Sequence, residues 1–330
     1  MITICIYFIA RGIILHLIYS TRRAIMRPDL APDSWQQSHQ LQRIQQSLFY
    51  IESSLDQPLS VDLLAQKVHW SRWQFQRVFQ RETGMSVALY VRNLRLSTAA
   101  KLLLTTNKRH VDIALECGFE SEISFHKSFR KSYHCTPGNY RKCGQYYDLK
   151  QPLALSRPDK IAPQLTPKLL QIKIETQPAT RLYGLSGKFN GIFSKNENFE
   201  VIVPKLWQAL KSKTNLDRSD QHIGMIDLTN VNPNHTDIPY WACIETDDIA
   251  LQQQLDFIDI PQQHYAVLPH IGPAQQMVKT LQWFILEWLP SSNYLAMNGY
   301  DIERYSKNFN PTTADAYMEY WVPVTPKELF

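Results

Sequence analysis

Two stretches of this sequence, SRWQFQRVFQR at residues 71–81 and SEISFHKSFRK at residues 121–131, decide the fold of its first half. Aligned on their first serines, both carry phenylalanine at two shared positions four residues apart and basic residues at two others. A spacing of four puts the phenylalanines on one helical face, so they are predicted to anchor a core. A serine before such a run is a favoured N-cap. The repeat therefore predicts two equivalent amphipathic helices, with Phe75 and Phe79 matched by Phe125 and Phe129.

The residues around this repeat predict helices throughout residues 38–142. Apolar residues recur at spacings of three and four from Leu41 to Leu55, and the run ends before Pro58 because the residue preceding a proline resists helical conformation. Short helices are predicted after Ser60 and over residues 111–117, each followed by a tight turn and one of the repeated helices. A short helix, a tight turn and a repeated helix thus occur in this order twice, which predicts two helix-turn-helix motifs.

A longer predicted helix, residues 86–104, separates the two motifs. At about 1.5 Å per residue it spans roughly 28 Å, and turns of DNA recur every ~34 Å. A rigid connector of this length suits two recognition helices in adjacent major-groove segments, so one chain would read an asymmetric site without dimerising. Residues 26–150 carry 17 basic and 11 acidic side chains, whereas residues 151–330 carry 15 and 19. This asymmetry is typical of a polyanion-binding domain joined to a second function.

Residues 38–142 resemble the AraC/XylS-type DNA-binding domain. The resemblance lies in DQPLSVDLLAQKVHWSRWQFQRVFQRETG, VRNLRLSTAAKLLL and VDIALECGFESEISFHKSFRKSYHCTPGNYR. Within the family, SRWQFQRVF is most similar to one subgroup. That resemblance implies that the first recognition helix reads bases with a Trp, a Gln and an Arg, which fall here on Trp73, Gln76 and Arg77. The second helix departs from that subgroup, which is rich in Gln and Thr and has Arg at the main contact. The predicted DNA contacts are Arg72, Trp73, Gln76, Arg77, Arg81, Ser124, His126, Lys127, Arg130 and Lys131.

The second half of the chain has a different character. Residues 143–167 are rich in proline and polar residues and are predicted to be a linker. Within residues 168–325, strand-like runs and two helices, at 199–213 and 273–288, follow the order strand, helix, strand, strand, twice over. We therefore predict a multi-domain fold, with an all-α N-terminal domain that contains two helix-turn-helix motifs and an α+β C-terminal domain that contains a duplicated unit.

Residues 168–325 resemble the GyrI-like small-molecule-binding domain, through IPYWACIE, HYAVLPHIGP, EWLPSSNY, YDIERY and YMEYWVPV. The resemblance implies an aromatic-lined cleft that holds a carboxylate and binds amphipathic, often cationic, compounds. The matching acid is Glu303 of YDIERY, and strand alternation places Tyr305 on its face. The alternative, that the aromatic residues are simply core, stays open. The predicted ligand-binding residues are Trp241, Glu303, Tyr305, Glu319 and Trp321.

Residues 1–37 are set apart as an N-terminal extension, either a non-native start or disordered. Residues 2–18 are strongly apolar but include Arg11 and His16, whereas a membrane-spanning helix needs about 20 predominantly apolar residues. Basic residues follow the run and no small-residue cleavage site appears, unlike a signal peptide. We interpret residues 1–25 as an upstream extension of a reading frame that starts at Met26. A membrane anchor is the alternative.

The spacing of the cysteines and the catalytic and nucleotide-binding motifs that the sequence lacks exclude several classes of function. The five cysteines form no CxxC pair and no zinc-finger spacing, and no Walker, GxGxxG, GxSxG or HExxH motif occurs. We therefore predict a cytoplasmic, sequence-specific transcriptional regulator of the AraC family with no catalytic residues, no metal and no cofactor. It is expected to bind double-stranded DNA as a monomer, to activate through RNA polymerase, and to respond to a small amphipathic or cationic ligand. The alternatives are a GyrI-like hydrolase with Glu303 as general base, and a membrane-tethered regulator.

Overall fold

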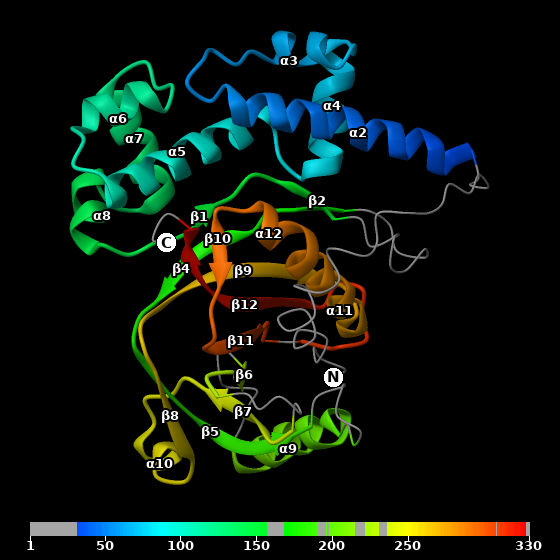
Figure 1. Cartoon of the computed structure of the whole chain (residues 1–330), viewed down its shortest axis with the longest axis vertical. Helices are drawn as coiled ribbons and strands as arrows, with labels where there is room; N and C mark the ends of the chain where they lie inside the picture. Colours follow the sequence, from blue (N-terminus) through cyan, green and yellow to red (C-terminus); the bar gives the residue numbers. More distant parts are fainter. Residues whose placement is uncertain are drawn as a thin grey trace. The chain divides into compact units, whose positions relative to one another are not determined.

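The computed structural model describes residues 32–156, 168–190, 196, 198–214, 222–230, 236–307 and 309–327. These residues form a helical unit, made of residues up to 155 together with 168–175, and a sheet-rich unit that begins at residue 176 and includes Ser156 (Figure 1). The apolar run at residues 2–18 and the proposed start at Met26 lie outside the described residues. Within the described part of the chain, no helix is long and apolar enough to cross a membrane.

The helical unit has the helices that the sequence predicts. Serines at four N-caps each accept a hydrogen bond from the backbone amide three residues later, which satisfies an otherwise unpaired donor of the first helical turn. The first helix begins at Pro32, before the predicted boundary at residue 38, since proline is favoured in the first helical turn. The helices are α2 (Pro32–Ser53), α3 (Val61–Lys67), α4 (Arg72–Thr83), α5 (Val87–Thr105), α6 (His110–Glu116), α7 (Glu122–Tyr133) and α8 (Pro137–Cys143).

The repeated phenylalanines are core anchors, as predicted. Phe75, Phe79, Phe125 and Phe129 are all 0% exposed. Within each pair the rings meet edge to face, with centroids 5.6 Å apart in α4 and 5.5 Å apart in α7. Burying one such ring stabilises a fold by about 1.5–3 kcal/mol. Because these rings take the inward face of α4 and α7, the polar residues between them are left on the outward face.

The segment after α8 packs on the helical unit. Strand β1 (Leu149–Lys150) pairs with β4 (Lys173–Gln177), and β2 (Ala154–Ser156) with β3 (Lys168–Leu170) forms a two-stranded sheet. The hydroxyl of Tyr90 on α5 accepts a hydrogen bond from the backbone amide of Leu153 at 3.1 Å. These contacts hold part of the proline-rich segment against the connecting helix α5.

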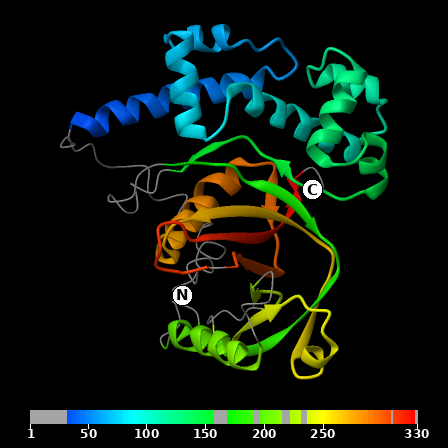
Figure 2. The same ribbon diagram turned by 180° about the vertical axis from the view of Figure 1, so that it is seen from behind.

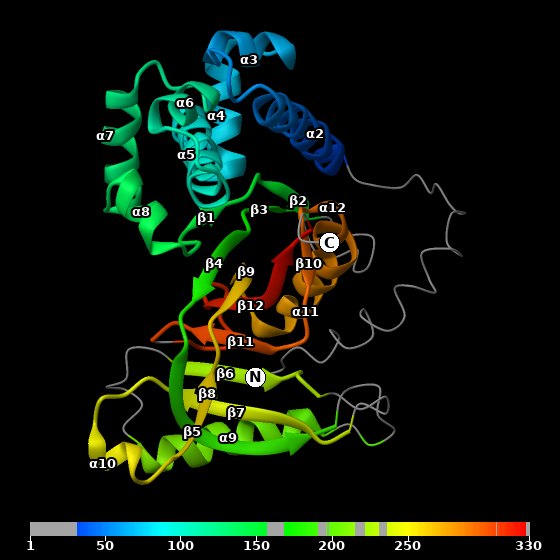
Figure 3. The same cartoon turned by 60° about the vertical axis from the view of Figure 1, so that its left-hand side comes forward.

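The sheet-rich unit is a duplicated, antiparallel α+β arrangement, as predicted. Its strands lie in the order β9-β12-β11-β6-β7-β5-β8, and Figure 3 labels them. Figure 2 shows the same unit from behind. The repeats are β5-α9-β6-β7 and β9-α11-β11-β12. The elements are β5 (Thr180–Phe189), α9 (Phe199–Lys213), β6 (His222–Asp227), β7 (Ile238–Ile244), α10 (Ile249–Gln252), β8 (Asp256–Ile260), β9 (Gln263–Ile271), α11 (Ala274–Trp283), η3 (Phe284–Trp288), α12 (Leu289–Ser291), β10 (Tyr294–Ala296), β11 (Tyr300–Tyr305) and β12 (Tyr317–Pro326).

Three of these elements are absent from the sequence prediction. Helix α10 and strands β8 and β10 are short, and β8 (DFIDI) carries acidic residues that disfavour a strand assignment. Tertiary pairing forms β8 nonetheless, because residues 180–184 of β5 pair with all five residues of β8. The predicted helix at 273–288 is also not uniform, since α11 passes into a π-helical turn, η3, at Phe284.

The register of the sheet decides which side chains share a face. Tyr240 on β7 lies opposite Gly187 on β5 and Ile226 on β6, and Glu303 on β11 lies opposite Gly224 on β6. Helix α9 packs on this face, since a Cβ at Gly187 would lie 3.0 Å from the side chain of Leu206. The opposite face carries an apolar cluster that includes Ile302.

Candidate functional sites

The outward face of α4 carries the residues predicted for the first recognition helix. Arg72, Trp73, Gln76 and Arg77 are all exposed, and Trp73 is 67% exposed. The guanidinium carbon of Arg77 lies 5.1 Å from the centroid of the Trp73 ring. A large aromatic side chain that stays in solvent contributes little to folding, so this face is available to bind a partner.

Two arginines of α4 form surface ion pairs. Nη1 of Arg72 lies 2.9 Å from a carboxylate oxygen of Asp62, with side-chain exposures of 61% and 55%. Arg81 donates hydrogen bonds to Glu82 and Gln40. Exposed pairs of this kind are worth about 0–1 kcal/mol. Because these ion pairs are weak, they orient the two arginines but would not prevent either from binding a more highly charged partner.

The outward face of α7 is basic. Lys127, Arg130 and Lys131 are exposed, and Ser124 and His126 are half-buried. Four of the five predicted residues of α7 line one open groove of about 530 Å³, and Ser124 instead lines a second groove beside Gly118 and Ser128. The first groove is lined by His126, Lys127, Arg130, Lys131, Thr136 and Pro137.

The two motifs are joined through α5. Helix α5 contacts α4 from the first motif and both α6 and α7 from the second, and Figure 1 shows it running between the two pairs. Arg95 on α5 donates hydrogen bonds to the carbonyl oxygens of Leu55, at 2.9 Å, and Gln57, at 2.7 Å. These carbonyls belong to the segment between α2 and α3, so a single side chain fixes the first motif to the connector.

The sheet-rich unit contains a buried carboxylate among aromatic side chains. Glu303 is 0% exposed, and its Oε2 accepts hydrogen bonds from the hydroxyls of Tyr240, at 3.1 Å, and Tyr305. Trp207 of α9 donates from Nε1 to the Tyr240 hydroxyl at 3.0 Å. Oε1 of Glu303 has no hydrogen-bond partner among the residues that the structure describes. A buried acceptor without a donor is costly to the fold and is a candidate for binding a ligand.

A glycine makes room for this cluster. A Cβ at Gly224 would lie 2.6 Å from Oε2 of Glu303 and, at 2.4 Å, would overlap the hydroxyl of Tyr240. Tyr305 is further enclosed by Trp207, edge to face at 5.7 Å between centroids, and by Phe309 at 4.8 Å. The carboxylate therefore lies in a low-dielectric, aromatic environment.

The electrostatics of Glu303 follow from this environment. Burial raises the pKa of Glu303 to about 7, although the hydrogen bonds from Tyr305 and Tyr240 act in the opposite direction. Burial and the nearby Glu303 also raise the pKa of both tyrosines well above the usual value. Near neutral pH the carboxyl group is therefore poised between its neutral and charged forms, and a cation beside it would favour the charged form.

The structure does not bring the other predicted ligand residues to Glu303. Trp241, Glu319 and Trp321 lie on the opposite face, because the register places Tyr320 rather than Trp321 opposite Glu303. Trp241 and Trp321 join the apolar cluster on that face, and Glu319 accepts hydrogen bonds from Trp321 and from the hydroxyl of Tyr317. Of the five predicted ligand-binding residues, only Glu303 and Tyr305 lie next to each other on one face of the sheet.

Sequence reasoning missed three neighbours of Glu303. Trp207, Tyr240 and Gly224 come from α9, β7 and β6, which only the sheet topology brings beside β11. Tyr240 directly precedes the predicted Trp241, and the pairing of β7 with β6 places Tyr240 rather than Trp241 on the face of Glu303. Knowledge of the β6–β7 and β6–β11 registers would have corrected the choice.

Comparisons with known proteins agree with this geometry. Residues 64–143 match the family described as a helix-turn-helix domain, and residues 170–325 match the GyrI-like small molecule binding domain. The helical half is therefore a helix-turn-helix domain, and it is followed by a GyrI-like small molecule binding domain that contains the buried carboxylate.

Three curated relatives match the helical half. Regulatory protein SoxS of Salmonella typhimurium is 39% identical over 104 residues, which cover 32% of this chain and 96% of SoxS. Transcriptional regulator Rob of the same organism is 38% identical over 114 residues, which cover 34% of this chain and 39% of Rob. The uncharacterised regulator YbfP of Bacillus subtilis is 44% identical over 98 residues, covering 30% of this chain and 33% of YbfP. The chain thus spans less than half the length of Rob and of YbfP. It belongs to the AraC/XylS family, in the Rob type with a GyrI-like C-terminal domain.

Proposed function

We propose that this protein is a transcriptional activator that binds an asymmetric double-stranded DNA site as a monomer and is modulated by a small amphipathic cation. Helices α4 and α7 enter adjacent major-groove segments, and Glu303 receives the ligand. The observation that carries the DNA-binding part is the matched pair of α4 and α7, each with two fully buried phenylalanines on one face and polar or basic residues on the other.

The side chains of α4 suit direct reading of bases. An arginine pairs in a bidentate manner with guanine and a glutamine with adenine, which are roles for Arg77 and Gln76. Trp73 offers apolar surface for a thymine methyl group. Moving Arg77 away from the exposed ring of Trp73 costs only about 0.5–1 kcal/mol, so the contact seen here does not prevent base reading.

The second helix combines one or two base contacts with several phosphate contacts. Ser124 and His126 are half-buried on the outward side of α7 and are the proposed base readers. The exposed cations Lys127, Arg130 and Lys131 are proposed to contact phosphates, as are Arg72 and Arg81 of α4. Phosphate contacts position the protein and make binding salt-dependent.

The ligand part of the proposal rests on Glu303. A lipophilic cation gains from pairing with a carboxylate in a low-dielectric site and from contact with aromatic faces. The unpartnered Oε1 supplies the acceptor, and Trp207, Tyr240 and Tyr305 supply the aromatic surroundings. The protein is proposed to be a regulator rather than a hydrolase, because its curated relatives are named as regulators.

Mapping bound sites across the genome of the source organism, followed by footprinting, tests the DNA part. We expect one asymmetric site per monomer, protected over two adjacent major-groove segments on one face of the duplex. Transcription in vitro with RNA polymerase and a mapped promoter should then increase on addition of the protein. Symmetric sites bound by dimers, or a decrease in transcription, would contradict the proposal.

Calorimetry with a lipophilic quaternary ammonium cation and its neutral carbon isostere tests the ligand part. We expect the cation to bind and the isostere to bind at least tenfold more weakly. Hydrolysis of small electrophilic esters by the same preparation would instead favour the enzyme.

A further inference from the structure

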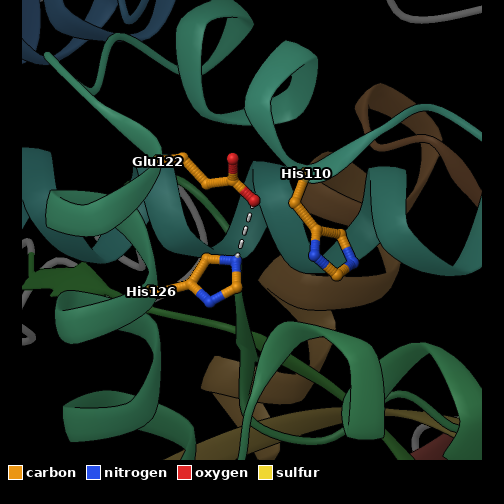
Figure 4. Close-up of side chains that lie close together, drawn as sticks. All are labelled: His110, Glu122 and His126. Atoms are coloured by element: carbon orange, nitrogen blue, oxygen red, sulfur yellow. Dashed lines mark ion pairs between the residues drawn. The ribbon is translucent and has the colours of Figure 1, made fainter.

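Three side chains of the second helix-turn-helix motif bring metal-ligating atoms together. His110 begins α6, and Glu122 and His126 lie four residues apart on α7, so the latter two share one helical face. Figure 4 shows the three side chains close together, and one ligand atom from each lies within 4.8 Å of those of the other two. The rings of His110 and His126 have centroids 5.3 Å apart. Within the described part of the chain, no other trio of His, Cys, Asp or Glu is arranged in this way.

One ligand atom of this trio makes no hydrogen bond within the described part of the chain. Nε2 of His126 is buried and makes no hydrogen bond to any residue that the structure describes. Its nearest charged neighbour, Oε1 of Glu122, lies 3.5 Å away, beyond a good hydrogen bond. The two groups are thus oriented toward each other at ion-pair distance, and neither distance nor burial prevents both from binding one cation.

The spacing fits a small transition-metal ion. Zinc bonds of about 2.0–2.1 Å in tetrahedral geometry hold two ligand atoms about 3.3 Å apart. The distance of 3.5 Å between Glu122 and His126 is already close to that value. The remaining separations between the ligand atoms are all within 4.8 Å. Glu122 and His126 have side-chain exposures of 46% and 38%, so the trio lies near the protein surface although Nε2 of His126 is itself buried.

We propose that His110, Glu122 and His126 form a binding site for a divalent transition-metal ion, best suited to Zn²⁺, that links α6 to α7. Two imidazoles and one carboxylate are a common zinc donor set, and the fourth position is left for water. The ligands follow the spacing H-x₁₁-E-x₃-H, which differs from zinc-finger spacing and is recognised only once α6 and α7 are packed together.

A zinc titration of the demetallated full-length protein, in competition with a chromogenic chelator, tests this site. We expect one high-affinity equivalent per chain, and a characteristic d–d spectrum when Co²⁺ replaces Zn²⁺. His110→Ala, His126→Ala and Glu122→Gln should each weaken zinc binding at least tenfold and alter the cobalt spectrum. Matched controls outside the trio, His134→Asn and Glu120→Gln, should leave both unchanged.

Circular dichroism in the presence of chelator establishes whether each variant is folded. Glu122→Gln changes no shape, so it keeps the test valid if a histidine variant fails to fold. Zinc affinity that is unchanged in Glu122→Gln and His126→Ala, or equally weakened in the controls, would overturn the proposal. Since zinc binding is measured without DNA, failure of DNA binding would contradict the proposed function and leave the metal site standing.

Discussion

The guanidinium of Arg95 on α5 packs directly against Gly118 in the turn between α6 and α7. A Cβ at Gly118 would lie 2.8 Å from the Arg95 guanidinium carbon and 2.3 Å from the carbonyl oxygen of Leu55. Arg95 itself donates hydrogen bonds to the carbonyls of Leu55 and Gln57. The turn of the second motif, the connector and the loop of the first motif thus meet at one point. This contact therefore joins both helix-turn-helix segments to α5.

Gly118→Ala should therefore destabilise the helical unit more than glycine replacement elsewhere. The matched control is Gly84→Ala, because Gly118 has φ +74 and Gly84 has φ +73, but nothing lies within 4 Å of a Cβ at Gly84. In Gly84→Ala, only the backbone strain at this positive φ should lower the free energy of unfolding, by about 1 kcal/mol. We expect Gly118→Ala to cost about 1–3 kcal/mol more, since backbone or Arg95 must move. Urea unfolding of both variants measures the difference, and equal losses would show that the contact is unimportant.

Arg77→Ala should remove a base contact, and Lys131→Ala a phosphate contact. The first variant is expected to lose about 1–3 kcal/mol at the specific site and to relax preference at one base pair. The second should weaken specific and non-specific binding alike and lower the slope of log K against log salt by about 0.9. Fluorescence anisotropy titrations at several salt concentrations distinguish them. Equal effects on the specificity ratio would show that base readers and phosphate contacts have been assigned wrongly.

The raised pKa of Glu303 predicts that the free energy of unfolding decreases as pH rises. The pKa of this carboxyl is raised from 4.5 to about 7, so the folded protein retains a proton that the unfolded chain has already lost. The unfolded state then binds fewer protons over that interval, and the unfolding free energy decreases as pH rises through it. At 1.36 kcal/mol per unit, the full loss is roughly 3 kcal/mol. Glu303→Gln, which cannot ionise, should lack this component. Denaturation at pH 5 and pH 8 checks it, and parallel pH profiles would contradict it.

Cation binding should show the opposite pH dependence. A cation pairs with the ionised form of Glu303, so its affinity should rise as pH increases through about 7, and Glu303→Gln should remove both the affinity and its pH dependence. Glu319→Gln is the matched control, because Glu319 lies on the other face of the sheet. Calorimetry at pH 6 and pH 8 measures both variants. A loss of affinity in Glu319→Gln equal to that in Glu303→Gln would contradict the proposal that the ligand binds on the face of the sheet that carries Glu303.

Zinc should change how α7 reads DNA. When Nε2 of His126 binds an ion, that nitrogen cannot contact a base, whereas Arg130 and Lys131 stay exposed for phosphates. The difference in affinity between wild type and His126→Ala at the second half-site should then disappear in saturating zinc. Anisotropy titrations with zinc and with chelator measure this difference. A difference that persists unchanged in zinc would show that the ion and the base contact do not compete.

Local sequence pattern is enough to predict the helices of the first half and the matched outward faces of α4 and α7. Periodicity, N-cap serines and the phenylalanine repeat act within one or two helical turns, so 0% exposure of Phe75 and Phe125 follows from local pattern. The buried acid at Glu303 was likewise predicted, although from family resemblance rather than from pattern.

Only the tertiary structure decided what surrounds these residues. Tyr240 and Trp241 are adjacent and both aromatic, and the pairing of β7 with β6 and of β6 with β11 alone puts Tyr240 beside Glu303. A shift of one residue in either register would exchange them, since successive side chains of a strand point to opposite faces. His110 meets His126 for a similar reason, because the packing of α6 on α7 joins residues that no local spacing relates.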